Sequence, residues 1–215
     1  FFVAFRIPNT FRRLFAEGTF NAAFVPSYSS ELTKGKLKSD KFANEIFNLL
    51  LCGLLFLVLL IEIFMPAFVG LIAPGFVEDS KKIELAIDLT RITFPFLLFV
   101  SLASFFAAIL NSHNKFAVAS AAPIILNLIL IGILIFGKYL NDNLIYYLSY
   151  GVSFAGLLQL VFLYIFVKKY YSIKFNFKFR LNQKVKIFFK KLLPSIFSSG
   201  VTQINILIGT IIASF

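Results

Sequence analysis

The sequence predicts an all-α protein in which a bundle of helices crosses a membrane several times. The first observation is composition: 59% of the 215 residues are hydrophobic and only 14% are charged, whereas soluble domains carry about 25% charged residues. The second is the length of the apolar runs, several of which reach the roughly 20 residues that a helix needs to cross the hydrocarbon core of a bilayer. A buried core in a soluble protein would not need runs of that length.

Six helical segments follow from apolar run length and from the polar residues between the runs. The first segment contains several charged residues and is expected to end before Pro26, where a polar stretch begins. The third is expected to bend at Phe94-Pro95, because proline lacks the N–H that an uninterrupted helix uses. Together they form a single transmembrane domain, residues 1–215. The six segments are 1–25, 44–69, 82–111, 116–139, 145–167 and 186–215.

Lysine is distributed unevenly among the connections between these segments. The first connection, 34–41, and the fifth, 168–186, are strongly basic, whereas the second and fourth mix acids with lysines. Cytoplasmic connections of membrane proteins are enriched in Lys and Arg, so the odd connections are expected on the cytoplasmic side. The fifth connection alternates charged with apolar residues from Ile173 to Arg180. This alternation allows a short strand, but it favours an amphipathic stretch at the lipid interface.

Several functional classes are excluded by composition. The net charge of +11 does not indicate nucleic acid, because the basic residues lie between membrane-length runs and not on one solvated face. Cys52 is the only cysteine and His113 the only histidine, so we expect no disulfide, no metal site and no Ser-His catalytic pair. No phosphate-binding glycine-rich loop and no signal peptide is found, and no cofactor is expected. Both ends of the sequence lie next to or inside apolar runs, so we interpret the sequence as a fragment.

The first segment carries the candidate functional residues. An arginine inside a membrane costs about 2.5–3.5 kcal/mol on insertion scales, so these arginines should face a bundle interior or a wet cavity. At 100° per residue, Arg6, Asn9, Arg13 and Glu17 share one stripe, and Arg12 projects about 100° from Arg13. Arg13 and Glu17 are four residues apart and can neutralise each other. Arg12 has no such partner in its own helix and is the better candidate for an anionic ligand such as a phosphate.

Two further features of this segment bear on the site. Arg6 lies toward the outer end of the helix, where snorkelling to the headgroups and contact with a ligand are equally good interpretations. Pro8-Asn9 is expected to open the helix, and an opened backbone at membrane depth is tolerated only beside protein or water. Both features are consistent with a cavity beside the first segment.

These residues resemble the signature of the MurJ (MviN) family, in the multidrug, oligosaccharidyl-lipid and polysaccharide exporter superfamily. The first block reads Phe-Phe-Val-Ala-Phe-Arg-Ile-Pro-Asn at 1–9, Arg-Arg-Leu-Phe-Ala-Glu-Gly at 12–18 and Phe-Val-Pro at 24–26. The similarity continues at 73–76, 93–96, 101–103, 109–111, 122–123, 126–127 and 158–160.

The resemblance implies a fold of fourteen membrane helices in two lobes, of which this chain supplies the second to the seventh and so part of the N-lobe. It implies transport of lipid II, the lipid-linked peptidoglycan precursor, from the inner to the outer leaflet of the bacterial cytoplasmic (inner) membrane. The arginine that matches Arg12 lines the cationic cavity of the family, and the chain is not expected to be an enzyme. Three alternatives stay open: an exporter of another polyprenyl-linked oligosaccharide or a drug, a membrane enzyme acting on polyprenyl phosphates, and a scaffold that binds partners through its basic connections.

Overall fold

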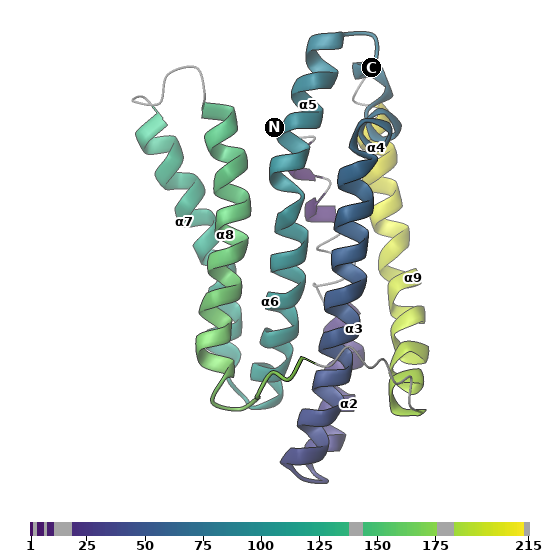
Figure 1. Ribbon diagram of the computed structural model, residues 1–215, viewed down its shortest axis with the longest axis vertical. Coiled ribbons are helices and arrows are strands. Elements are labelled where there is room, and N and C mark those ends of the chain that lie inside the picture. The colour runs from purple at the N-terminus through teal and green to yellow at the C-terminus, as the bar shows by residue number, and fades with distance from the viewer. Residues whose placement is uncertain (2–3, 7, 11–18, 138–143, 176–182, 213–215) are drawn as a thin grey trace.

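A computed structural model describes residues 1, 4–6, 8–10, 19–137, 144–175 and 183–212 of the chain. Within these ranges every regular element is helical, and the long helices run up and down beside one another (Figure 1). This confirms the predicted all-α fold class. The elements are α2 (Thr19–Leu32), α3 (Lys36–Ile63), α4 (Met65–Ile72), the 3-10 helix η1 (Pro74–Phe76), α5 (Ser80–Thr93), α6 (Pro95–Ser112), α7 (Phe116–Phe136), α8 (Leu144–Val167) and α9 (Gln183–Ile212).

Four helical stretches in the described part of the chain are long and apolar enough to cross a membrane. They correspond to the second, third, fourth and fifth predicted segments, with α5 and α6 together forming one of them. The sixth predicted segment, 186–215, corresponds to α9, which begins at Gln183. The first, 1–25, is described only in part. The spans are Lys36–Ile63, Ser80–Ser112, Phe116–Phe136 and Leu144–Val167.

Two predicted helix limits are wrong. Helix α2 does not end before Pro26 but continues through it to Leu32. Phe24 and Tyr28 lie on either side of this proline, are fully buried, and stack with ring centroids 5.5 Å apart. Their packing outweighs the missing N–H of Pro26, as tertiary contacts often do. The second segment begins at Lys36 and not at 44, because the buried Ser39 and Phe42 anchor this basic turn to the bundle.

The predicted bend at Phe94-Pro95 is confirmed, since α5 ends at Thr93 and α6 begins at Pro95. The hydroxyl of Ser153, on α8, donates a hydrogen bond to the carbonyl of Ile92 beside the break. A neighbouring helix thus supplies a donor where the helical ladder is interrupted, which is what a break at membrane depth requires. A second break, at Phe64 between α3 and α4, was not predicted, although Pro66 at the start of α4 marks it.

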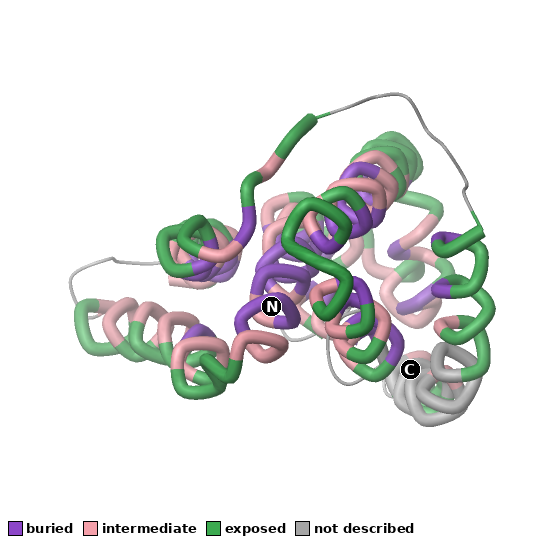
Figure 2. The backbone as a smooth tube through the Cα atoms, turned by 90° about the horizontal axis from the view of Figure 1, so that it is seen from below, coloured by how far each residue is buried: buried purple, intermediate pink, exposed green. Residues whose placement is uncertain are grey.

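The core lies around α6, whose neighbours cover it from several sides, while exposed residues lie on the rim (Figure 2). In the α5–α6 span, 67% of the most apolar 18-residue stretch is buried, whereas in α7 only 6% of the corresponding stretch is buried. Yet the mean hydropathy of α7 is the higher of the two, 2.5 against 2.2. Hydropathy therefore reports compatibility with lipid and not burial in protein. Close packing of α8 on α6 depends on Gly156, where an added Cβ would lie 2.6 Å from Cδ2 of the buried Phe96.

The connections alternate between the two ends of the bundle, as the sequence predicts. Residues 33–35, 113–115 and 168–175 lie at one end, which we call the basic end, and residues 73–79 lie at the other, which we call the opposite end (Figure 1). Of the fifth connection, residues 172–175 form no strand, and 176–182 lie outside the described residues. By the positive-inside rule the basic end is expected in the cytoplasm.

Candidate functional site

The structure describes two of the five candidate residues, Arg6 and Asn9. Arg12, Arg13 and Glu17 lie outside the described residues, so the predicted pairing of Arg13 with Glu17 and the separate direction of Arg12 remain predictions. Residues 4–6 and 8–10 are helical, which agrees with a helix at the start of the chain, but the expected opening at Pro8-Asn9 is not found in these described residues. Asn9 is half-buried, and Arg6 is exposed.

Arg6 lies on the face of its helical turn that is turned away from the bundle. Ala4 and Pro8 are buried, and the carbonyl of Ala4 lies 3.0 Å from the Thr93 hydroxyl, a donor at the end of α5. The ring of Phe5 packs 6.2 Å from that of Phe96 on α6. Arg6 is about 200° around the helix from Ala4, and its side chain is exposed. A guanidinium in such a position can bind a phosphate through two parallel hydrogen bonds.

A second group of charged residues lies at the basic end, around Glu31. The Glu31 side chain is 7% exposed and accepts hydrogen bonds from Nζ of Lys34 at 2.8 Å and from Nζ of Lys184 at 2.5 Å. Burial acts to raise the pKa of Glu31, but the hydrogen bonds and charges of Lys184 and Lys34 outweigh it and hold the pKa below its ordinary value. Glu31 therefore stays ionised and ties the end of α2 to the start of α9.

Asn44 on α3 holds the connection that follows α8. Its Oδ1 accepts from the Tyr171 hydroxyl at 2.7 Å and from the backbone N–H of Lys174 at 2.6 Å. Its Nδ2 donates to the carbonyl of Ser172 at 3.2 Å, and Asn48, one turn further, donates to the carbonyl of Lys174 at 3.2 Å. The described part of the fifth connection is thus fixed onto α3 by side-chain amides.

His113, in the connection between α6 and α7, packs between two tyrosines. Its ring stacks on Tyr170 with centroids 4.6 Å apart, and Nε2 lies 3.4 Å from the Tyr28 hydroxyl. Burial, and then the charge of Lys36, lower the pKa of His113, while Asp40 acts in the opposite direction. Burial also raises the pKa of Tyr28 to about 12. Both rings are therefore uncharged at neutral pH and support packing of α2 on the ends of α6 and α8.

Glu31 and Asn44 were not singled out from the sequence. Each has a partner more than 100 residues away along the chain, Lys184 for Glu31 and Ser172 for Asn44, and neither residue is part of a motif. A buried acid and a membrane-helix amide could have been noticed as polar residues next to apolar runs, but their partners could not have been named.

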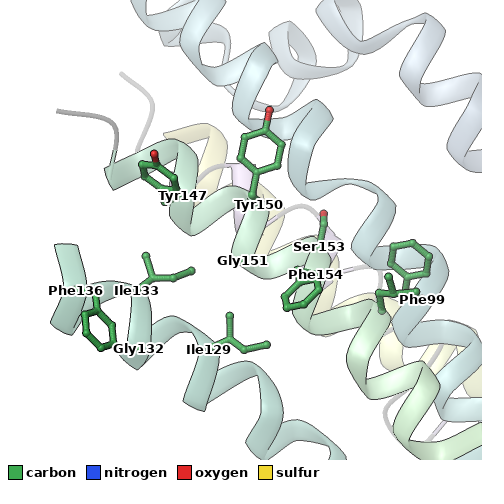
Figure 3. A pocket seen from close by; sticks show the side chains of 11 residues that line it. Phe99, Ile129, Gly132, Ile133, Phe136, Tyr147, Tyr150, Gly151, Ser153 and Phe154 are labelled. Carbon is green, nitrogen blue, oxygen red and sulfur yellow. The ribbon is translucent and has the colours of Figure 1, made fainter. Parts of the chain in front are cut away.

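One cavity lies between α7 and α8 and is unsuited to an anionic headgroup. Its volume is about 800 Å³, and its walls are apolar side chains such as Ile129, Ile133 and Phe154, joined by Phe99 of α6 (Figure 3). Of its three hydroxyl-bearing residues, Ser153 already donates to a carbonyl of α5. The apolar walls of this cavity are suited to a hydrocarbon chain.

Comparison with known proteins agrees with this architecture. The family model described as "Lipid II flippase MurJ" matches residues 1–215. A probable lipid II flippase MurJ of Rhizobium meliloti (strain 1021) is 43% identical over 220 residues, covering 100% of this chain and 41% of the relative. A probable lipid II flippase MurJ of Rickettsia prowazekii (strain Madrid E) is 40% identical over 215 residues, covering 99% of this chain and 42% of the relative.

A solved structure, "Lipid II flippase MurJ, inward closed conformation", superposes with a TM-score of 0.83 at 27% identity. The match covers 100% of this chain and 43% of that structure. The chain thus spans less than half the length of the relatives it matches. With four helices able to cross a membrane and these relatives, the chain is part of a multi-pass protein of the bacterial inner membrane, and it belongs to the MurJ family of lipid II flippases.

Proposed function

We propose that the protein containing this chain moves lipid II from the inner to the outer leaflet of the cytoplasmic membrane for cell wall biosynthesis. The observation that carries the proposal is the match of the whole chain to the family, at 40–43% identity to relatives named as probable lipid II flippases. The chain supplies helices of the N-lobe, and residues 1–215 act as one transmembrane domain within it.

The proposed mechanism is alternating access, in which two lobes rock about a substrate held between them. The pyrophosphate of lipid II binds to cationic side chains on the open side of the N-lobe, chiefly Arg12, with Arg6 and Arg13 beside it. Glu17 and Asn9 act as a charge partner and a positioning group. The exposed position of Arg6, on the opposite side of its turn from the buried Ala4 and Pro8, supports this arrangement. No covalent step is involved, so the protein acts as a transporter and not as an enzyme.

The test is rescue of cells depleted of their own lipid II flippase by the complete gene, carrying either the native residue or Arg12→Ala. We expect the native gene to rescue growth and Arg12→Ala to fail at equal membrane abundance, because alanine removes the bidentate donor. Arg12→Lys should rescue only in part, since an ammonium keeps the charge but not the fork. Lys168→Ala, an exposed lysine of the fifth connection, is the control and should rescue fully.

Two outcomes would contradict the proposal. Rescue by Arg12→Ala would remove Arg12 from the substrate site while leaving the transport function in place. Failure of the native gene at normal abundance would contradict lipid II as the substrate and favour another polyprenyl-linked oligosaccharide, or an enzyme acting on polyprenyl phosphates.

A further inference from the structure

A groove between α3 and α9 has two chemically different parts that lie end to end. Near the basic end, a cavity of about 440 Å³ is lined by Lys38, Lys41, Phe42 and Glu45 of α3 and by Gln183 and Lys184 of α9. A second cavity, of about 460 Å³, continues along the same two helices. Its walls are leucines and phenylalanines of both helices, with Phe20 of α2 at the side.

The residues that line the second cavity follow those of the first along both helices. On α3, Glu45 of the first cavity is followed directly by Ile46 of the second, and on α9, Phe188 of the second lies one turn after Lys184 of the first. In the view of Figure 1, α9 lies beside α3, and α9 packs chiefly on α2 and less closely on α3. We call the whole feature the α3–α9 groove. Lysines line its part near the basic end of the bundle, which we call the mouth, and apolar side chains line the rest.

The length of the apolar part matches one leaflet of a membrane. From Ile46 to Leu57 helix α3 rises about 16 Å, close to half of the roughly 30 Å hydrocarbon thickness of a bilayer. Gly53 lies within this stretch, and a Cβ added there would have nothing within 4 Å. Phe56 and Leu193, also in this wall, are 69% and 53% exposed. The apolar part is therefore open to an acyl chain.

The mouth has the charge that an anionic headgroup requires. Three lysines face one carboxylate, Glu45. The ammonium groups of Lys38 and Lys41 are exposed and form no ion pair within the described residues. Lys184 is held by Glu31, but an ammonium has three donors and can still offer one to the groove. Basic pockets between membrane helices on the cytoplasmic side suit anionic lipid headgroups.

We propose that the α3–α9 groove holds one anionic phospholipid of the cytoplasmic leaflet, with its phosphate among Lys38, Lys41 and Lys184 and an acyl chain along Gly53 and Leu57. This lipid site is separate from the substrate residues of the first segment, and it stands whether or not the protein transports lipid II. The bound lipid covers exposed apolar side chains such as Phe56 and Leu193 and so stabilises the contact between α3 and α9.

The test uses the full-length protein in nanodiscs, with phosphatidylglycerol and phosphatidylcholine of identical acyl chains, and counts retained lipids by native mass spectrometry. We expect one phosphatidylglycerol to be retained in preference to phosphatidylcholine. Lys38→Gln combined with Lys41→Gln should weaken its binding about 25-fold, because each lysine near an anionic group contributes about fivefold. The control, Lys168→Gln combined with Lys169→Gln, removes the same charge from exposed positions at the same end and should change binding less than twofold.

A second pair of variants tests the apolar part. Gly53→Leu fills open space in the groove and should remove the retained phosphatidylglycerol, whereas Gly132→Leu adds the same side chain at another open position, on α7, and should not. Equal retention in Gly53→Leu and the native protein, or equal loss in the two lysine pairs, would overturn the proposal.

A cross-linking experiment separates lipid from protein as the occupant. Leu50 lines the apolar part of the groove. A photoreactive probe attached at Leu50→Cys, in a protein without other cysteines, should form adducts with phospholipid. An adduct with another segment of the same chain would overturn the proposal, because it would show that the rest of the protein covers the α3–α9 groove.

Discussion

The two ends of the bundle are held by different kinds of contact. At the basic end, Asn44 binds Ser172, 128 residues away, and Glu31 binds Lys184, 153 residues away. At the opposite end, Asp79 caps α5 by accepting from the backbone N–H groups of Lys81 and Lys82 at 3.1 and 3.2 Å, all within three residues. The difference teaches that the opposite end is specified by local sequence, whereas the basic end forms only when the whole lobe has folded.

The largest expected effect concerns the sides of the membrane on which the ends lie. Single cysteines are placed at Lys36 and at Glu78, both exposed, in a full-length protein without other cysteines. An impermeant maleimide added to spheroplasts should label the cysteine at 78 fully and the one at 36 only after permeabilisation. Equal labelling of both sites in intact spheroplasts would contradict the assignment of the two ends to opposite sides.

The next largest effect should follow from Asn44→Ala. This change removes the acceptor of the buried Tyr171 hydroxyl together with three further hydrogen bonds. Since an unsatisfied buried polar group costs about 1–3 kcal/mol, we expect the free energy of unfolding to fall by about 3 kcal/mol in denaturant titrations of the full-length protein. Asn48→Ala, which removes one hydrogen bond to Lys174, is the matched comparison and should cost about 1 kcal/mol. Equal losses in the two variants would contradict the special role of Asn44.

A smaller effect is expected for Glu31→Gln. The two lysines it leaves are about half exposed and regain water, so the loss should be about 1 kcal/mol. The pKa of Glu31 is lower in the folded protein than its ordinary value of 4.5, so the unfolded state binds more protons near that pH. The contribution is therefore complete above about pH 4.5 and disappears as the pH falls further. Stability curves of the native protein and Glu31→Gln should converge at low pH, and parallel curves would refute the link.

The smallest effect should come from the opposite end, with Asp79→Ala. The change removes the cap of α5 and the exposed pair with Lys82, and both are local and accessible to water. We expect unfolding temperature to fall less than for Glu31→Gln, and Asp79→Asn to restore it, because asparagine caps helices equally well. A loss larger than that of Asn44→Ala would reverse the ranking of the two ends.

The sequence predicted the parts of the fold that depend on composition and local chemistry. Run length identified the helices that correspond to α3, α5–α6, α7 and α8, and Phe94-Pro95 located a break. The prediction of helix limits failed where packing decided the outcome. At Pro26, the stacking of buried aromatic rings keeps α2 helical beyond the proline. The sequence also could not rank burial, because α7 is the more apolar helix and the less buried one.

For the candidate site, only the types of residue involved were predictable from the sequence. Arginines in an apolar segment predict a cavity, and this stays a prediction because Arg12, Arg13 and Glu17 lie outside the described residues. The polar contacts of the basic end could not be predicted, because Glu31 and Asn44 meet partners on helices or connections far along the chain. Such contacts depend on the relative positions of whole helices, which no local pattern encodes.

The most direct test of the central claim is a translocation measurement with the purified full-length protein in vesicles. Fluorescent lipid II is placed in both leaflets, and an impermeant quencher reports the fraction that reaches the outer surface over time. We predict that the native protein and Lys168→Ala let nearly all of the label be quenched, and that Arg12→Ala at equal incorporation leaves about half protected, as in empty vesicles. Native protein that leaves the same fraction protected as empty vesicles would contradict the proposed function.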